Sequence, residues 1–124
     1  VADRVVLTGR VDESALSWLT RHAAVVAYVS LDEGFGFPLL QAMQAEVPIV
    51  ASTAGSIPEV AGDAAVMVPC DDTDAISAAL LDVLGNEALR RRLVDAGRGR
   101  WAQYRWDDTA AGITAVYRTI AGTS

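Results

Sequence analysis

Lysine is absent from this chain of 124 residues: all ten basic residues are arginines, and 16 acidic residues bring the net charge to −6. This negative balance argues against nucleic acid as the main partner, because phosphates attract basic surfaces. Signalling receiver domains are also small and acidic, but they need a lysine beside an acidic pocket and are therefore nearly excluded. The single cysteine, Cys70, can form no internal disulfide and fits a reducing compartment such as the cytoplasm.

Histidine is equally scarce. His22 is the only one, so the sequence offers no histidine pair for a metal, and capping near a helix end explains its place. The apolar runs are too short to span a bilayer. Arginines that could form a basic face are interpreted as a solvated helix face rather than a lipid-binding patch; they are Arg90, Arg91, Arg92, Arg98, Arg100 and Arg105.

The chain does contain apolar runs that alternate with helical patterns. This alternation predicts an α/β fold with a parallel sheet and right-handed crossovers, and the length fits one domain, residues 1–124. Because the sequence starts without methionine, we expect a fragment of a longer protein. Strands are predicted at 5–7, 24–29, 48–51 and 65–68, and helices at 12–23, 38–45, 57–60 (one turn), 73–85, from 86 to about 104, and from 106 onward.

The most informative segment lies between the strand at 24–29 and the helix at 38–45. It contains an acid, Glu33, and two glycines, and Pro38 then opens the helix at a position where a missing N–H costs nothing. Glycine lets a ligand approach the backbone closely, and free N–H groups at a helix start favour a phosphate. The acid would repel a phosphate, but it can accept hydrogen bonds from hydroxyl groups. The segment therefore suggests a site for a sugar attached to a phosphate.

A second loop, 53–59, follows the next strand along the chain. Ligands of parallel sheets bind beyond the carboxyl ends of the strands, so we expect the two loops to converge. N–H groups near Ser56 and Ile57 could meet phosphate or sugar oxygens. Phe35 and Phe37 are expected to pack under the first loop rather than to stack on a base. The helix from Trp106 is expected to pack on the domain with its apolar residues inward, namely Ile113, Val116, Tyr117 and Ile120.

Three motifs in order resemble the donor-binding domain of GT-B glycosyltransferases, and most closely the large retaining family 4: Glu-Gly-Phe-Gly-x-Pro-Leu-x-x-Ala-Met from position 33, Pro-Ile-Val-Ala-Ser from 48, and Gly-Ser-Ile-Pro-Glu-Val from 55. The resemblance covers nearly the whole chain. It implies a Rossmann-like parallel sheet flanked by helices, the C-terminal domain of a GT-B fold lacking its first strand-helix segment. It also implies transfer of a sugar from a nucleoside-diphosphate sugar to an acceptor hydroxyl.

The same resemblance assigns site residues and partners. Glu33 matches the acid that contacts the transferred sugar and is the expected catalytic residue. The expected donor-binding residues are Gly34, Phe35, Gly36, Phe37, Pro38, Leu39, Gln41, Gly55 and Ser56. The family generally works without a metal, so no cofactor is expected. The partners would be the nucleotide-sugar donor and an N-terminal acceptor domain, without which this chain alone would be inactive. A peripheral place at the inner face of a membrane stays open.

Two positions depart from the family pattern. Gln41 stands where the family usually has a second glutamate for the nucleotide ribose, and a neutral amide is a weaker acceptor than a carboxylate. Glu46 stands where a glycine commonly ends the helix in a left-handed conformation, so its backbone is expected to be strained.

Other functions fit these residues less well or stay open. Gln41 supports a degenerate, non-catalytic binding or scaffold module that kept the fold, whereas Glu33 and the intact loop argue against it. A nicotinamide dehydrogenase fits poorly, because Leu39 stands where the dinucleotide fingerprint has a third glycine. A GT-B epimerase or phosphorylase stays open, because a fold does not determine a reaction.

Overall fold

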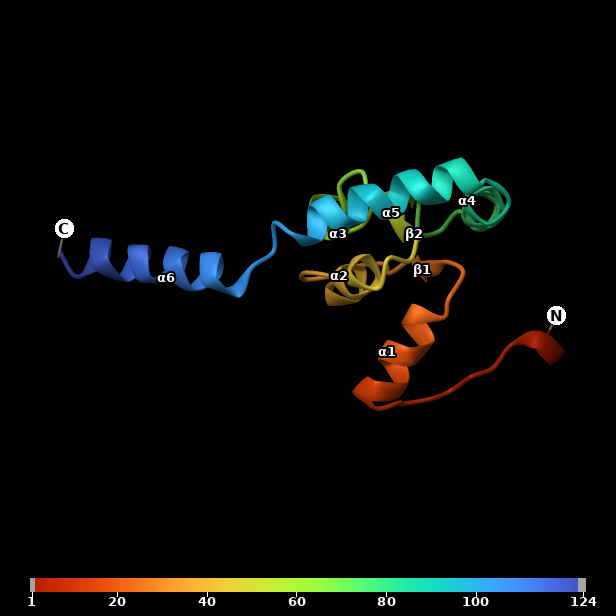
Figure 1. The fold of residues 1–124 in the computed structure, drawn as a ribbon, viewed down its shortest axis with the longest axis horizontal. Helices are drawn as coiled ribbons and strands as arrows, with labels where there is room; N and C mark the ends of the chain where they lie inside the picture. Colours follow the sequence, from red (N-terminus) through yellow and green to blue (C-terminus); the bar gives the residue numbers. More distant parts are fainter. Residues whose placement is uncertain (1, 123–124) are drawn as a thin grey trace.

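The protein is described by a computed structural model in which residues 2–122 are placed. The fold is a three-stranded parallel sheet of order β1-β2-β3 flanked by helices (Figure 1). This architecture confirms the α/β, Rossmann-like prediction. The elements in chain order are the 3-10 helix Ala2–Arg4, α1 (Glu13–Arg21), β1 (Val26–Tyr28), α2 (Phe37–Gln44), β2 (Ile49–Ser52), α3 (Ile57–Ala61), β3 (Ala65–Val68), α4 (Thr73–Gly85), α5 (Glu87–Trp101) and α6 (Trp106–Ile120).

The central strand β2 organises the core. It pairs with β1 in the register Val26 to Ile49 and with β3 in the register Ile49 to Ala65, and all four of its residues are buried. Alternate residues of a strand point to opposite faces, so β2 contributes to two clusters. Ile49 and Ala51 pack with α2 and α3, while Val50 packs with α4 and α5. Both faces are therefore covered, as a parallel sheet requires.

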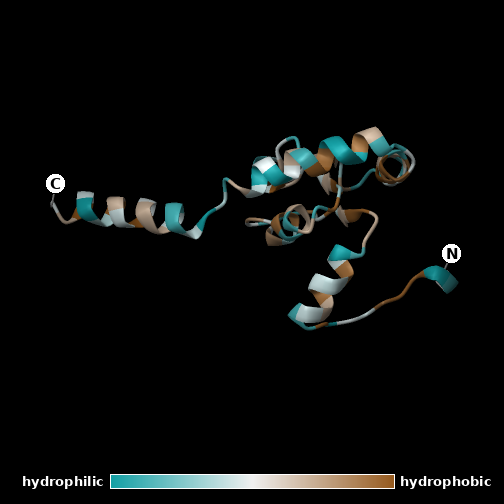
Figure 2. Ribbon diagram, in the orientation of Figure 1, coloured by the Kyte–Doolittle hydropathy of each residue, from teal (hydrophilic) through white to brown (hydrophobic). Residues whose placement is uncertain are grey.

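The predicted strand at 5–7 does not form. Val5, Val6 and Leu7 are 57%, 83% and 91% exposed and belong to no ladder within residues 2–122. They lie on an extended arm away from the sheet, a hydrophobic stretch of the ribbon in Figure 2. A three-residue apolar run becomes a strand only when a neighbour pairs with its backbone, and no described strand runs beside this arm.

The expected packing of the last helix is also wrong. Helix α6 points away from the rest of the molecule (Figure 1), and Trp106 at its start is 79% exposed. The predicted inward residues are exposed as well: Ile113 52%, Val116 58%, Tyr117 68% and Ile120 77%. The apolar stripe predicted from the sequence exists, but no described part of the chain covers it.

Glu46 does adopt the predicted left-handed backbone, with φ 59°. Its carboxylate forms a two-pronged ion pair with Arg98 of α5, with Oε1 to Nε at 2.9 Å and Oε2 to Nη2 at 2.6 Å. The hydrogen bond from Arg98 holds the pKa of Glu46 below its ordinary value. The ion pair, which connects the end of α2 to α5, therefore offsets the strain of the left-handed backbone at Glu46.

This compensation predicts that one substitution changes Tm by different amounts in two backgrounds. Glu46→Gly removes both the left-handed strain and the ion pair, so its effect on Tm in the wild-type chain should be small. In an Arg98→Gln background only the strain remains to be lost, and Tm should rise by roughly 3 °C. Thermal unfolding of the four chains measures this. An equal effect of Glu46→Gly in both backgrounds would contradict the account.

Candidate functional site

The loops that follow β1 and β2 meet through main-chain contacts. The Ser56 N–H donates to the carbonyl of Glu33 at 3.3 Å, and Ser56 Oγ donates to the same oxygen at 3.0 Å. Behind them, the fully buried Ser52 donates its hydroxyl to the Ser30 carbonyl at 2.6 Å. The predicted convergence of the two loops at the carboxyl end of the sheet is therefore confirmed.

Gly55 lies at the tightest point of this junction. Its φ is +54°, and a Cβ placed there would be 2.7 Å from the Glu33 carbonyl oxygen, 2.9 Å from the Glu33 nitrogen and 2.9 Å from Asp32 Oδ1. Real Cβ atoms do not approach backbone atoms so closely. The contact distance, together with the positive φ, explains why glycine occupies this position.

The Glu33 carboxylate is half-buried and partly held. Ser30 Oγ donates to its Oε1 at 3.1 Å, and the Tyr28 hydroxyl also interacts with the carboxylate. Burial raises the pKa of the adjacent Tyr28, and the Glu33 carboxylate raises it further. Ser30 thus positions one carboxylate oxygen, and the carboxylate keeps lone pairs that can accept hydrogen bonds from a ligand.

The start of α2 supplies donors beside this acid. Gly36 caps the helix with φ 95°, and Pro38 occupies the first turn. In the described part of the chain, the N–H groups of Gly34, Phe35 and Gly36 have no protein acceptor. Leu39 is different, because its N–H donates to the Gly36 carbonyl at 3.0 Å and its side chain is fully buried. Leu39 therefore supports the loop from beneath.

The two phenylalanines do not pack under the loop as expected. Phe35 is 38% exposed and Phe37 57% exposed, with their ring centroids 4.9 Å apart. Phe35 also meets Tyr104 edge to face at 5.8 Å. Their outer sides line a groove of about 890 Å³ between α2 and the α5–α6 junction. The rings form one side of this groove, and residues 101–109 form the other.

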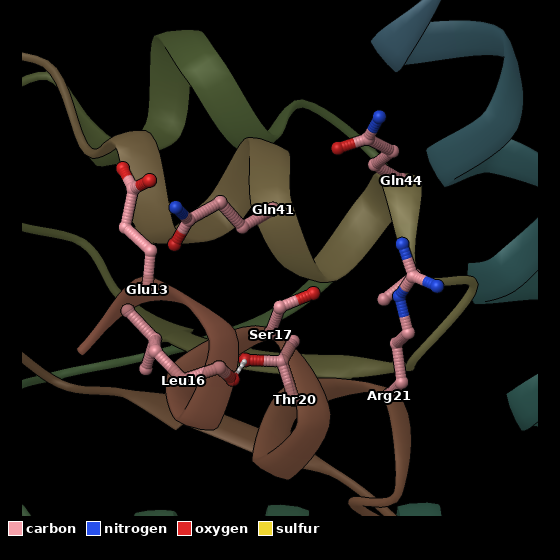
Figure 3. Close-up of a pocket in the computed structure, with 8 residues that line it drawn as sticks. Glu13, Leu16, Ser17, Thr20, Arg21, Gln41 and Gln44 are labelled. Atoms are coloured by element: carbon pink, nitrogen blue, oxygen red, sulfur yellow. Dashed lines mark hydrogen bonds between the residues drawn. The ribbon is translucent and has the colours of Figure 1, made fainter. Parts of the chain in front are cut away.

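Gln41 of α2 lines two hollows: this groove and a smaller cleft on the side of α2 that faces α1. The smaller cleft, of about 190 Å³ between α1 and α2, is also lined by Glu13, Arg21 and Gln44 (Figure 3). In that view Glu13 projects from the first turn of α1 on the same side as the Gln41 amide. Glu13 belongs to no sequence motif, and its position in the first helical turn is the only signal that favours a ligand-facing acid.

The arginine segment is only in part the solvated face that was predicted. Arg91 and Arg98 are more than half exposed and pair with carboxylates. Arg90 and Arg100, in contrast, donate to backbone carbonyls: Arg90 to Leu84 at 2.6 Å, and Arg100 to Val60 at 3.0 Å. Arg100 and Tyr104 therefore contact the back of α3, a role that their sequence positions do not reveal.

Residues 2–122 contain no group of three His, Cys, Asp or Glu side chains able to hold a metal ion. Nor does any helix in that range have the length and hydropathy to cross a membrane.

Known proteins are similar to this chain in sequence and fold. The family model described as "Glycosyl transferases group 1" matches residues 1–100. The chain is 35% identical over 112 residues to "O-antigen chain mannosyltransferase B" of Escherichia coli, covering 90% of this chain and 29% of that protein. It is 34% identical over 124 residues to "Phosphatidyl-myo-inositol mannosyltransferase" of Mycobacterium leprae, covering 98% and 33%.

A solved structure has a similar fold. "Sucrose-phosphate synthase (tll1590) from Thermosynechococcus elongatus" superposes with a TM-score of 0.85 at 29% identity, over 98% of this chain and 31% of that one. The chain thus spans about a third of the length of the proteins that it matches.

Proposed function

Because this chain belongs to the group 1 glycosyl transferases, we propose that it is the nucleotide-sugar-binding part of a retaining glycosyltransferase. The fold is that of a GT-B C-terminal domain. The observation that carries the proposal is the junction of the two loops, where a half-held carboxylate lies beside free N–H groups. A sugar has hydroxyls for the carboxylate, and a diphosphate has oxygens for the N–H groups.

Each residue then has a distinct task. The Glu33 carboxylate accepts hydroxyl hydrogen bonds from the transferred sugar, while Ser30 keeps it in place. Gly34, Phe35 and Gly36 offer N–H groups to donor oxygens. Fixed donors that face the developing negative charge of a leaving diphosphate stabilise the transition state, and they need no metal to do so. We expect the reaction to proceed without a bound metal or other cofactor.

The remaining site residues would shape the pocket. Phe37 and Pro38 form the start of α2, Leu39 supports it from the core, and Gln41 faces the position proposed for the nucleotide ribose. Gly55 and Ser56 hold the second loop against Glu33.

The uncovered face of α6 and the groove beside Phe37 would contact an N-terminal acceptor domain. Slower amide hydrogen exchange in α6 when that domain is present would support this contact, and unchanged exchange would contradict it.

The bacterial relatives named as mannosyltransferases make a mannosyl donor the first one to test. We propose that the protein acts in the cytoplasm, and the acceptor decides whether it works at the inner face of a membrane. Ligand-observed NMR of the chain with GDP-mannose, UDP-glucose and ADP-glucose tests the donor site directly. Saturation transfer to one nucleotide sugar, displaced by the matching nucleoside diphosphate, is expected. Transfer to none of them would contradict the proposed function.

A degenerate binding module is the second candidate, because Gln41 is uncharged. Glu13 offers another explanation: a glutamate at position 41 would place a second carboxylate in the same small cleft, where like charges repel. Exchanging the pair, Glu13→Gln with Gln41→Glu, keeps one carboxylate in the cleft. Under the enzyme hypothesis, wild type and the exchanged variant both bind the donor. If only the exchanged variant binds it, the natural chain has lost the function.

A further inference from the structure

We propose that Arg100 is a positioning residue for the donor site, one that holds helix α3 and thereby the loop that touches Glu33. The inference rests on the proposed function of that site. Arg100 belongs to α5 and lies about forty positions from the residues that it contacts. Neither its place in the sequence nor the family match assigns it any role.

Helix α3 needs an external support. It spans only Ile57–Ala61, and a helix of five residues has no independent stability in water. Its last carbonyls have no N–H partner inside the helix. Arg100 supplies these partners: Nε donates to the Val60 carbonyl at 3.0 Å, and Nη2 donates to the Glu59 carbonyl. A cation at a helix C-terminus also interacts favourably with the helix dipole.

The end of α3 lies directly against this guanidinium. Gly62 ends α3 with φ +54°, and a Cβ placed there would be 3.4 Å from Arg100 Nε. The planar guanidinium reaches two adjacent carbonyls at once, which the single ammonium of a lysine cannot reproduce. Arg100 is half-buried, so these hydrogen bonds are shielded from water more than those of the exposed Arg98.

Tyr104 extends the same support to the first loop. Arg100 Nη2 donates to Tyr104 Oη at 3.2 Å, and the tyrosine hydroxyl lies 3.4 Å from the Glu59 carbonyl. The Tyr104 ring meets Phe35 edge to face, with centroids 5.8 Å apart. The Arg100–Tyr104 pair therefore touches the C-terminal end of α3 and, through Phe35, the glycine loop that begins at Glu33.

The opposite end of α3 transmits this position to the acid. Val60 N–H bonds to the Ser56 carbonyl at 3.0 Å, and Ser56 bonds through both its N–H and its hydroxyl to the Glu33 carbonyl. The chain of contacts runs from Arg100 through α3 and Ser56 to Glu33. Loss of the guanidinium should let α3 shift, which moves Ser56 relative to the acid and weakens donor binding while the sheet stays intact.

The test compares two arginines of the same helix. Arg100→Gln removes the contact with α3, whereas Arg98→Gln removes the ion pair with Glu46 just after α2 and serves as the matched control. In ¹H–¹⁵N spectra without ligand, Arg100→Gln should shift the amide signals of Gly55 and Ser56 and speed hydrogen exchange in α3. With GDP-mannose, UDP-glucose and ADP-glucose as probes, it should raise the Kd of the bound sugar about tenfold. Arg98→Gln should leave the signals and the Kd unchanged.

Two further variants keep the outcome decisive. Arg100→Lys retains the charge and should recover only part of the affinity. If Arg100→Gln does not fold, Tyr104→Phe takes its place and should shift the amide signals of Gly55 and Ser56 by a smaller amount. Wild-type signals for Gly55 and Ser56 in Arg100→Gln would overturn the inference, even if donor binding is found. If wild type binds no probe, the proposed function fails, and the ligand-free spectra still decide whether Arg100 positions the loop.

Discussion

Replacing Gly55 with alanine is expected to lower the free energy of unfolding by about 2–3 kcal/mol and to abolish donor binding. The new methyl carbon would lie 2.7 Å from the Glu33 carbonyl oxygen and 2.9 Å from the Glu33 nitrogen. These neighbours are backbone atoms, so they cannot move aside as a flexible side chain would. The positive φ adds strain that any L-residue would have. Relief of the clash requires the two loops to separate at the proposed site.

Gly34→Ala is the control for this substitution. Gly34 lies in the first loop, outside the left-handed region, and a Cβ there would meet nothing within 4 Å. Its stability should change by less than about 0.5 kcal/mol, or rise slightly because alanine restricts the unfolded chain. Urea unfolding of both variants measures the difference in stability, and donor titration of Gly55→Ala measures the loss of binding. Equal stability of Gly55→Ala and wild type would show that the junction is looser than the structure indicates.

The junction itself could be predicted from the sequence because its signals are local. An apolar run, a glycine-containing turn and a proline at the start of a helix recur in order, and parallel strands place such turns at one edge. The periodicity of α4 and α5 was equally clear, and both helices form where predicted. The strained backbone of Glu46 was also expected, although that expectation came from the family pattern and not from the residue itself.

The errors share a different cause. Residues 5–7 and the face of α6 have the apolar patterns of a strand and of a packed helix, but an element forms or packs only when a partner surface is present. No described residue supplies that surface. Arg100 was misread for a related reason: its contacts with Glu59 and Val60 depend on how α5 approaches α3. The sequence pattern around Arg100 suggests only a charged helix face.

Glu33→Gln is expected to weaken donor binding by about 10- to 100-fold while leaving the fold unchanged. Hydrogen bonds to a charged acceptor contribute about 1.5–3 kcal/mol, and the amide keeps the size of the carboxylate but loses its charge. Ser30 and Ser56 can still contact the residue. Ser30 donates to a side-chain oxygen, which glutamine retains, and Ser56 donates to the main-chain carbonyl. Circular dichroism should therefore show wild-type secondary structure, and titration with the nucleotide sugar that wild type binds should show the loss.

Asp32→Asn separates the role of Glu33 from the general negative charge of the loop. Asp32 is the adjacent acid and is exposed to solvent, so its substitution removes the same charge one residue away. If the field of the loop were responsible, both variants would bind the donor with similar affinity. If the Glu33 carboxylate contacts the donor specifically, only Glu33→Gln should lose donor affinity. In the longer protein that contains this chain, Glu33→Gln should likewise slow sugar transfer and Asp32→Asn should not. Transfer at the wild-type rate by Glu33→Gln would refute the central assignment, because the half-held carboxylate would then have no part in the reaction.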